Sequence, residues 1–206
     1  MIDLERKLRR AASRSRGGPS AAALDGVRAR AGREGLVDVA YAHADSPFGP
    51  LTVATTERGL ALLAYPELPL DDLLARVVAQ ISPRVLEDPA RLDPVRRELD
   101  EYFAGRRRGF DLPIDWRLVR GGFYRAVLEA TATIPCGDTL TYREVAERAG
   151  NVKAVRAAGG GCGSNPVPIV VPCHRVVATG GGLGGYTGGL ERKRRLLALE
   201  RAEAVG

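Results

Sequence analysis

Between residues 36 and 65 the hydrophobic and polar positions alternate in short runs. Val37, Val39 and Tyr41 are separated by polar or small residues, and this two-residue period is typical of a half-buried strand. The segments "DSPFGP" and "ERG" interrupt the alternation, and the second has the length of a hairpin turn. The pattern therefore predicts three short strands in an antiparallel sheet.

After residue 69 the period lengthens to that of helices. The segments "LDDLLARVVAQI" and "DPVRRELDEYFAG" are amphipathic, and Gly105 closes the second. "FDLPIDW" then predicts an extended connector. We expect an α+β N-terminal domain over 34–115, preceded at 1–33 by a flexible or partly helical basic tail rich in Arg, Ala, Ser and Gly.

Residues 116–206 predict a mainly helical C-terminal domain. "GFYRAVLEATATI" predicts a helix ending at the turn "PCGD", and "GLERKRRLLALERAEA" predicts one with a leucine stripe. Glu200 falls near the edge of that stripe, where a carboxylate is costly unless it is bonded. A salt bridge to a neighbouring arginine and a role in orienting a catalytic imidazole both fit this position.

A helix-turn-helix is predicted near the middle of this domain. Thr141 precedes Glu144 by three residues, a capping box for a helix over 142–149. Asn151 is the expected N-cap of a second helix over about 152–161. Glycines and alanines crowd the second helix, which indicates close approach either to DNA or to another helix of the protein.

Candidate chemistry is concentrated in "IVVPCHRVVATG", residues 169–180. Prolines at 166, 168 and 172 predict a stiff, extended segment that ends at Cys173. A thiol with a pKa near about 8.5 needs a base to become a nucleophile. His174 could be that base. In an extended segment the side chains of residues 173 and 174 point to opposite faces, so contact between them requires a turn or helix start there, or a bridging water. An inert buried thiol is the alternative.

Charge and composition limit the classes of partner and cofactor that the chain is expected to bind. The net charge is +6, distributed as +5 over residues 1–35, −5 over 36–115 and +6 over 116–206. The basic C-terminal part predicts a polyanion partner, although solvated surface charge fits equally. Three cysteines and two histidines predict free thiols in a reducing cytoplasm, with no metal site and no cofactor. We expect no membrane association, since no apolar run approaches the roughly 18 residues of a span.

The glycine-rich loop "TGGGLGGYTGG" contains G-x-G-x-x-G at 180, 182 and 185. It does not predict dinucleotide binding, because no helix starts directly after it and no acidic residue lies at the expected distance. A loop over a pocket, with Tyr186 as a wall, fits better.

Four segments together resemble one family. "TYREVAERAG", "KAVRAAGG", "NPVPIVVPCHRVV" and "GGYTGGLERKRRLLALE" are similar to the O6-alkylguanine-DNA alkyltransferases, the methylated-DNA–protein-cysteine methyltransferases. The likeness extends from about residue 121 to 200. The N-terminal strands and helices look like that family's less well-defined N-terminal domain, and the tail has no identifiable counterpart.

The resemblance implies direct reversal of DNA damage. Cys173 would accept the alkyl group of O6-alkylguanine by SN2 displacement after base flipping, once per molecule. His174 and Glu200 match a water-bridged relay that removes the thiol proton. Asn165 matches the residue that holds the active-site segment. Tyr142 matches the tyrosine that protonates the departing guanine and drives nucleotide rotation.

The resemblance also implies the partners and their contacts. Double-stranded DNA carrying O6-alkylguanine would be bound by a cytoplasmic, nucleoid-associated monomer, with Arg156 replacing the flipped base. Further implied DNA contacts are Tyr142, Ala157, Gly160 and Cys162, and implied pocket residues are Pro168, Tyr186 and Thr187. Cys162 and Gly163 depart from the larger or basic residues common in the family, which leaves the strength of DNA binding open.

Two other functions remain possible on the residues alone. A binding module that marks lesions would not need Cys173, and a cysteine hydrolase would use Cys173 and His174 through many turnovers. The sequence leaves open the preferred alkyl size, cooperativity on DNA and the role of the tail.

Overall fold

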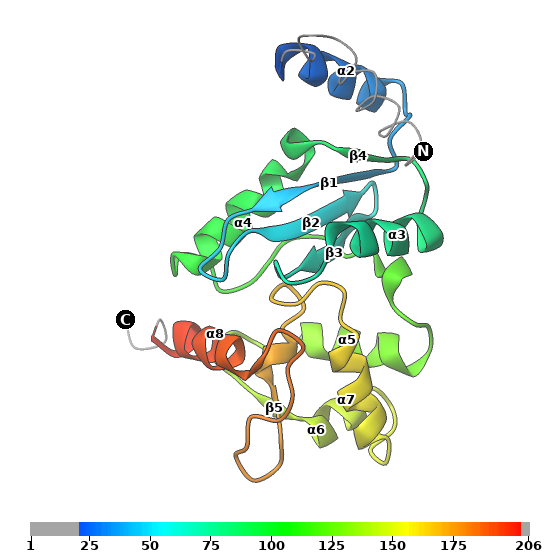
Figure 1. The fold of residues 1–206 in the computed structure, drawn as a ribbon. Helices are drawn as coiled ribbons and strands as arrows, with labels where there is room; N and C mark the ends of the chain where they lie inside the picture. Colours follow the sequence, from blue (N-terminus) through cyan, green and yellow to red (C-terminus); the bar gives the residue numbers. More distant parts are fainter. Residues whose placement is uncertain (1–20, 203–206) are drawn as a thin grey trace.

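The computed structural model describes residues 21–202, and they fold as a sheet half followed by a helical half (Figure 1). Helix α2 (Ala21–Arg33) occupies part of the predicted basic tail. Predictions for residues 1–20 lie outside the described residues. Within the described chain, no helix is long and apolar enough to cross a bilayer.

The predicted antiparallel strands are confirmed as β1 (Val39–Ala44), β2 (Leu51–Thr56) and β3 (Gly59–Ala64). A fourth strand, β4 (Val85–Glu87), pairs in parallel with β1, so the sheet order is β3-β2-β1-β4. The sequence did not predict β4, because three residues are too few to show a two-residue alternation.

Helices α3 (Leu70–Gln80) and α4 (Asp93–Phe103) confirm the two amphipathic segments and cover opposite faces of the sheet. Strand β1 is consequently buried on both faces rather than one. The core beneath α4 continues into the helical half through Leu128, Ile169 and Leu196. The two halves therefore share one hydrophobic core, and in it α4 packs with the segment that leads to Cys173. Two short 3₁₀ turns, η1 (Pro89–Leu92) and η2 (Trp116–Leu118), flank α4 and the connector.

The helical half contains the predicted helices and one small sheet. Its elements are α5 (Phe123–Ala132), α6 (Tyr142–Arg148), α7 (Val155–Gly163), the 3₁₀ helix η3 (Cys173–Arg175) and α8 (Leu190–Ala202). A two-stranded parallel sheet of β5 (Leu140–Thr141) and β6 (Val176–Val177), too short to give a periodic signal, was not predicted.

The helix-turn-helix is present, with one correction at its second helix. The capping box of Thr141 and Glu144 starts α6 as predicted. Helix α7 begins at Val155 rather than near residue 152, and Asn151 is not its N-cap. The Asn151 side chain instead accepts a hydrogen bond from the Lys153 amide at 3.1 Å. This local turn competes with helix formation and delays the helix start.

Two of the glycines in α7 allow it to pack closely against α5. A Cβ atom at Gly160 would lie 2.6 Å from the Tyr124 hydroxyl, and one at Gly161 would lie 2.9 Å from Val127 Cγ1. Contact between helices therefore explains these two positions. Gly159 lies beside Tyr142 instead, at the pocket described below.

Candidate active site

The proline-rich segment before Cys173 is a tight turn, so the prediction of an extended segment was wrong. The Val171 amide donates to the Val167 carbonyl at 3.0 Å, and Ile169 adopts a φ of 76°. Positive φ is costly for a β-branched residue and persists only where surrounding contacts enforce it. Prolines remove three amides from this stretch. The amides of Val167, Val171 and Cys173 bond within the turn instead of to a neighbouring strand.

Asn165 holds this turn and reaches the thiol. Its Oδ1 accepts a hydrogen bond from the Val167 amide at 3.0 Å. Its Nδ2 donates to the Val171 carbonyl at 2.8 Å and to Cys173 Sγ at 3.2 Å. One amide side chain thus fixes both the backbone before the cysteine and the position of its sulfur.

Cys173 is the first residue of η3, so a helix start lies at the cysteine–histidine pair. The side chain is only 4% exposed. Burial raises the pKa of the Cys173 thiol to about 12, and the Asn165 hydrogen bond only partly opposes this. The sulfur is therefore protonated at neutral pH, and reaction as a nucleophile requires a base.

His174 is fully buried, with Nε2 2.8 Å from Glu200 Oε1. Burial lowers the pKa of His174, and the contact with Glu200 only partly offsets that effect. The imidazole is therefore neutral, and the Glu200 contact assigns its proton to Nε2. Nδ1 is then an acceptor. It is buried and bonds no atom of the described residues, which is a costly arrangement for a polar atom.

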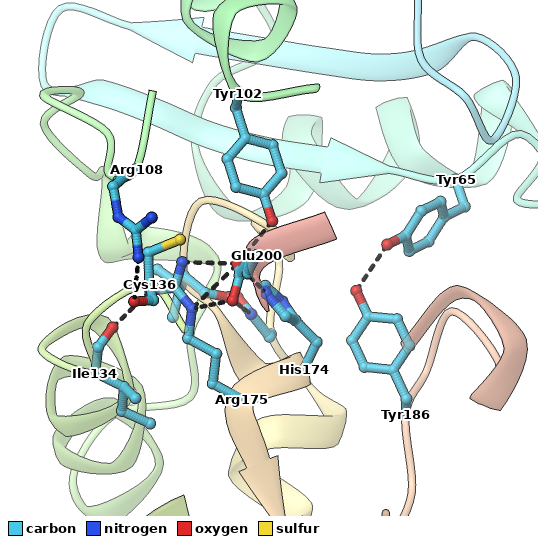
Figure 2. A network of polar contacts seen from close by, with 11 residues as sticks. Tyr65, Tyr102, Arg108, Ile134, Cys136, His174, Arg175, Tyr186 and Glu200 are labelled. Atoms are coloured by element: carbon cyan, nitrogen blue, oxygen red, sulfur yellow. Dashed lines mark hydrogen bonds and ion pairs between the residues drawn. The ribbon is translucent and has the colours of Figure 1, made fainter. Parts of the chain in front are cut away.

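Glu200, in the last turn of α8, accepts hydrogen bonds from three side chains (Figure 2). The donors are Tyr102 Oη at 2.7 Å, His174 Nε2, and Arg175 through Nε and Nη2 at 3.0 and 2.8 Å. Burial raises the pKa of Glu200, but the bonds from His174 and Arg175 outweigh it and hold the pKa well below its usual range. Buried carboxylates persist when they are paired in this way. The arginine salt bridge and the contact with the imidazole are both present.

A pocket of about 260 Å³ opens onto the sulfur. Its lining residues are Tyr142, Gly159, Cys162, Gly163, Cys173, Gly185, Tyr186 and Thr187. Thr187 Oγ1 donates to the Gly163 carbonyl at 2.8 Å, which closes one side. Pro168 is buried in the turn and is not one of the lining residues. Cys162 is 6% exposed and belongs to the pocket wall rather than to the outer surface of α7.

The glycine-rich loop is shaped by Lys193 and Tyr142. Lys193 is fully buried, and its Nζ donates to the carbonyls of Val176, Leu183 and Gly185. Tyr142 Oη donates to the Gly185 carbonyl at 3.1 Å. Gly184 has a φ of 68°, and a Cβ atom there would lie 2.6 Å from the Tyr142 ring. The loop therefore closes on the pocket in one arrangement.

Arg156 and its neighbours occupy the outer side of α7. Arg156 is exposed and makes no ion pair or hydrogen bond with any residue of 21–202. Ala157 is half-buried and Gly160 is exposed. The arginine is therefore free to reach an external partner.

Comparison with known proteins matches both halves of the chain to one family. Residues 39–116 match the ribonuclease-like domain of 6-O-methylguanine DNA methyltransferase, and residues 122–202 match its DNA binding domain. A methylated-DNA–protein-cysteine methyltransferase of Mycobacterium tuberculosis is 38% identical over 164 residues, covering 80% of this chain and 93% of its own. The chain belongs to the 6-O-methylguanine DNA methyltransferase family.

Other members of the 6-O-methylguanine DNA methyltransferase family agree with this assignment. The inducible methylated-DNA–protein-cysteine methyltransferase of Bacillus subtilis is 37% identical over 72% of this chain and 83% of its own. Mycobacterium tuberculosis OGT in complex with DNA superposes with a TM-score of 0.68 at 39% identity, covering 80% of this chain and 94% of that one. The match confirms the α+β sheet half and the mainly helical half expected from the sequence.

Sequence reasoning missed four residues at the site of this methyltransferase-family chain. These are Tyr65, Tyr102, Arg175 and Lys193. Lys193 carried a detectable signal, since it precedes Glu200 by seven residues and therefore shares its helix face. The two tyrosines gave no local signal, because they reach the site from the sheet half across the shared core.

Proposed function

We propose that the chain repairs O6-alkylguanine in double-stranded DNA by transferring the alkyl group to Cys173. One observation carries the proposal: a buried thiol faces a pocket, and the next residue is a neutral histidine held by an ionised glutamate. A sulfur with a pKa raised to about 12 is unreactive until a base takes its proton. His174 Nδ1 is the acceptor that the resting structure leaves available.

The transfer follows from these roles. A water molecule passes the thiol proton to His174 Nδ1, and Glu200 stabilises the imidazolium that forms. The sulfur attacks the alkyl carbon, so that a carbon–sulfur bond forms while the bond to O6 breaks. Tyr142 supplies a proton to the departing guanine, and proton exchange with solvent then returns the tyrosinate and the imidazolium to their resting states, so that one proton leaves the thiol and one reaches the base. Asn165 keeps the sulfur aimed at the pocket.

The alkylated oxygen lies inside the duplex, so the nucleotide must first be rotated out at a cost of a few kcal/mol. We propose that the outer side of α7 binds the duplex, with Ala157 and Gly160 close to its backbone, and that Arg156 fills the space left by the base. Tyr186, Thr187 and Cys162 then surround the flipped base. Pro168 supports the turn from behind.

A thioether is a poor leaving group, and the site contains no group that removes it. We propose that each molecule acts once, as a monomer on cytoplasmic, nucleoid-associated DNA, without metal or cofactor. The units would be 34–115 and 116–206, with the basic segment before residue 34 as an appendage.

Mass spectrometry of the protein after incubation with duplex DNA containing O6-methylguanine tests the proposal. We expect one added methyl group, on the peptide containing Cys173, and restored guanine in the DNA. The Cys136→Ala variant is the matched control, because it removes a cysteine outside the pocket, keeps the acceptor sulfur and should be methylated at Cys173. Methylation of another residue, or an unmodified protein with an intact lesion, contradicts it.

The same assay separates the two other functions. A module that only marks lesions would bind the duplex equally well as Cys173→Ala and would never gain a methyl group. A cysteine hydrolase would turn over esters or amides repeatedly instead of stopping after one equivalent.

A further inference from the structure

The pocket wall Tyr186 is tied to the sheet half by one hydrogen bond. Its hydroxyl lies 2.7 Å from that of Tyr65, and the two rings meet edge to face with centroids 6.3 Å apart (Figure 2). Tyr65 directly follows β3 and is 6% exposed. A residue outside the pocket therefore contacts a pocket wall directly.

Tyr65 is itself held rigidly. The Arg192 guanidinium lies 4.5 Å above its ring and forms an ion pair with Glu67. The Phe48 ring meets Tyr65 edge to face at 6.2 Å. Gly188 lies between the two tyrosines, since a Cβ atom there would be 2.4 Å from Tyr65 and 2.7 Å from Tyr186. These contacts pack Tyr65 on several sides.

The loop that carries Tyr186 is held by side-chain hydrogen bonds rather than by secondary structure, since Lys193 and Tyr142 bond the Gly185 carbonyl and Thr187 bonds the Gly163 carbonyl. Gly180, Gly181, Gly184 and Gly189 all have positive φ, in a stretch where glycine gives the backbone wide freedom. The position of Tyr186 therefore depends on side-chain anchors. Its ring lies between Tyr65 on one side and the His174 ring, at 6.4 Å, on the other.

We propose that Tyr65 is a specificity-determining residue, which limits the size of the O6 substituent by holding Tyr186 against the pocket. A fixed Tyr186 keeps the pocket small enough to favour methyl transfer. Without the Tyr65 hydroxyl the Tyr186 ring can shift away from the pocket although the loop backbone stays anchored, so bulkier groups such as benzyl are accepted more readily. The inference rests on the proposed alkyl transfer to Cys173.

The test compares rate constants for transfer from duplexes carrying O6-methylguanine or O6-benzylguanine. In Tyr65→Phe the benzyl-to-methyl ratio should rise by about two- to tenfold, the effect of losing one ordinary hydrogen bond. Tyr186→Phe removes the same bond from the other side. The benzyl-to-methyl ratio should therefore rise by a similar factor in Tyr186→Phe. In the double variant it should rise no further, because both substitutions remove the same bond.

Tyr41→Phe is the matched control, because it removes a hydroxyl from a buried tyrosine on the opposite face of the same sheet. Its ratio should equal that of the parent. An unchanged or lower ratio in folded Tyr65→Phe and Tyr186→Phe overturns the inference. A parent protein that takes no methyl group onto Cys173 overturns the proposed function instead, so the two failures are distinguishable.

Discussion

The hydroxyl of Tyr102 donates a hydrogen bond of 2.7 Å to Glu200 Oε1, across the boundary between the two halves. Tyr102 belongs to α4, which packs on the sheet, and Glu200 belongs to the last helix of the helical half. Burial and the adjacent Glu200 carboxylate raise the pKa of Tyr102, so it remains a donor throughout the working pH range. The sheet half therefore contributes directly to the hydrogen bonds of Glu200, the residue that holds the His174 imidazole.

Removing this hydroxyl should weaken the fold and alter the acidity of His174. Tyr102→Phe should lower the free energy of unfolding by about 1.5–3 kcal/mol, the usual range for a hydrogen bond to a charged group. Without the Tyr102 bond, the Glu200 carboxylate interacts more strongly with His174 and raises the pKa of the imidazole. The decline of the transfer rate in acid therefore begins at a higher pH. Urea unfolding and a pH–rate profile measure the two effects. A loss of stability with an unmoved profile would mean that Tyr102 is only structural.

The transfer rate should be insensitive to pH around neutrality. Burial lowers the pKa of His174 below its usual 6.5 and raises that of Cys173 to about 12, so the neutral pair persists between these limits. We expect a constant single-turnover rate from about pH 7 to about pH 9, with a decline only as acid protonates His174 below 6.5. A rate that already falls between pH 8 and 7 would contradict a neutral resting imidazole.

Arg156 should affect the rate of transfer from duplex DNA and leave the rate of reaction with the free modified base almost unchanged. Arg156→Ala should slow transfer from duplex O6-methylguanine by about tenfold, equivalent to about 1.4 kcal/mol, because the flipped state loses its replacement for the base. Reaction with free O6-benzylguanine base should change little. Arg96→Ala, which removes a partly exposed arginine on α4, is the control. Equal losses on both substrates would rule out this role.

Gly163 offers a position at which DNA affinity can be raised. A Cβ atom there meets nothing within 4 Å, and the residue borders the pocket at the end of α7. Gly163→Arg should tighten duplex binding and steepen the dependence of log K on log salt by about one unit. Gly109→Arg places the same charge at another open position, just before the connector. If Gly109→Arg raises the affinity for DNA as much as Gly163→Arg does, the gain comes from the added net charge, and the prediction that residue 163 lies near the duplex is wrong.

The sequence predicted well those features that are encoded locally. The alternation around Val39, the capping box of Thr141 and the helical spacing that leads to Glu200 each depend on neighbours within a few residues. The turn before Cys173 was mispredicted because the hydrogen bond that Asn165 donates to Val171 and the one that it accepts from Val167 hold the turn, and the prolines alone do not set its path.

Contacts between distant segments account for what the sequence could not indicate. Nothing near Tyr65 or Tyr102 distinguishes them from ordinary core tyrosines. Their functional contacts, with Tyr186 and Glu200, join residues separated by 121 and 98 positions. Burial of Cys162 in the pocket wall likewise depends on how α7 packs against α5.

The ties from Tyr65 and Tyr102 to the helical half also bear on how such a protein can diverge. Both tyrosines lie away from the outer side of α7 and on the half that carries neither the thiol nor the imidazole. On the roles proposed above, substitutions at these two places are expected to change the size of alkyl group accepted and the pH dependence of transfer, and they leave the outer side of α7 unaltered. Chimeras that exchange the first 115 residues between relatives would transplant both properties in a single step.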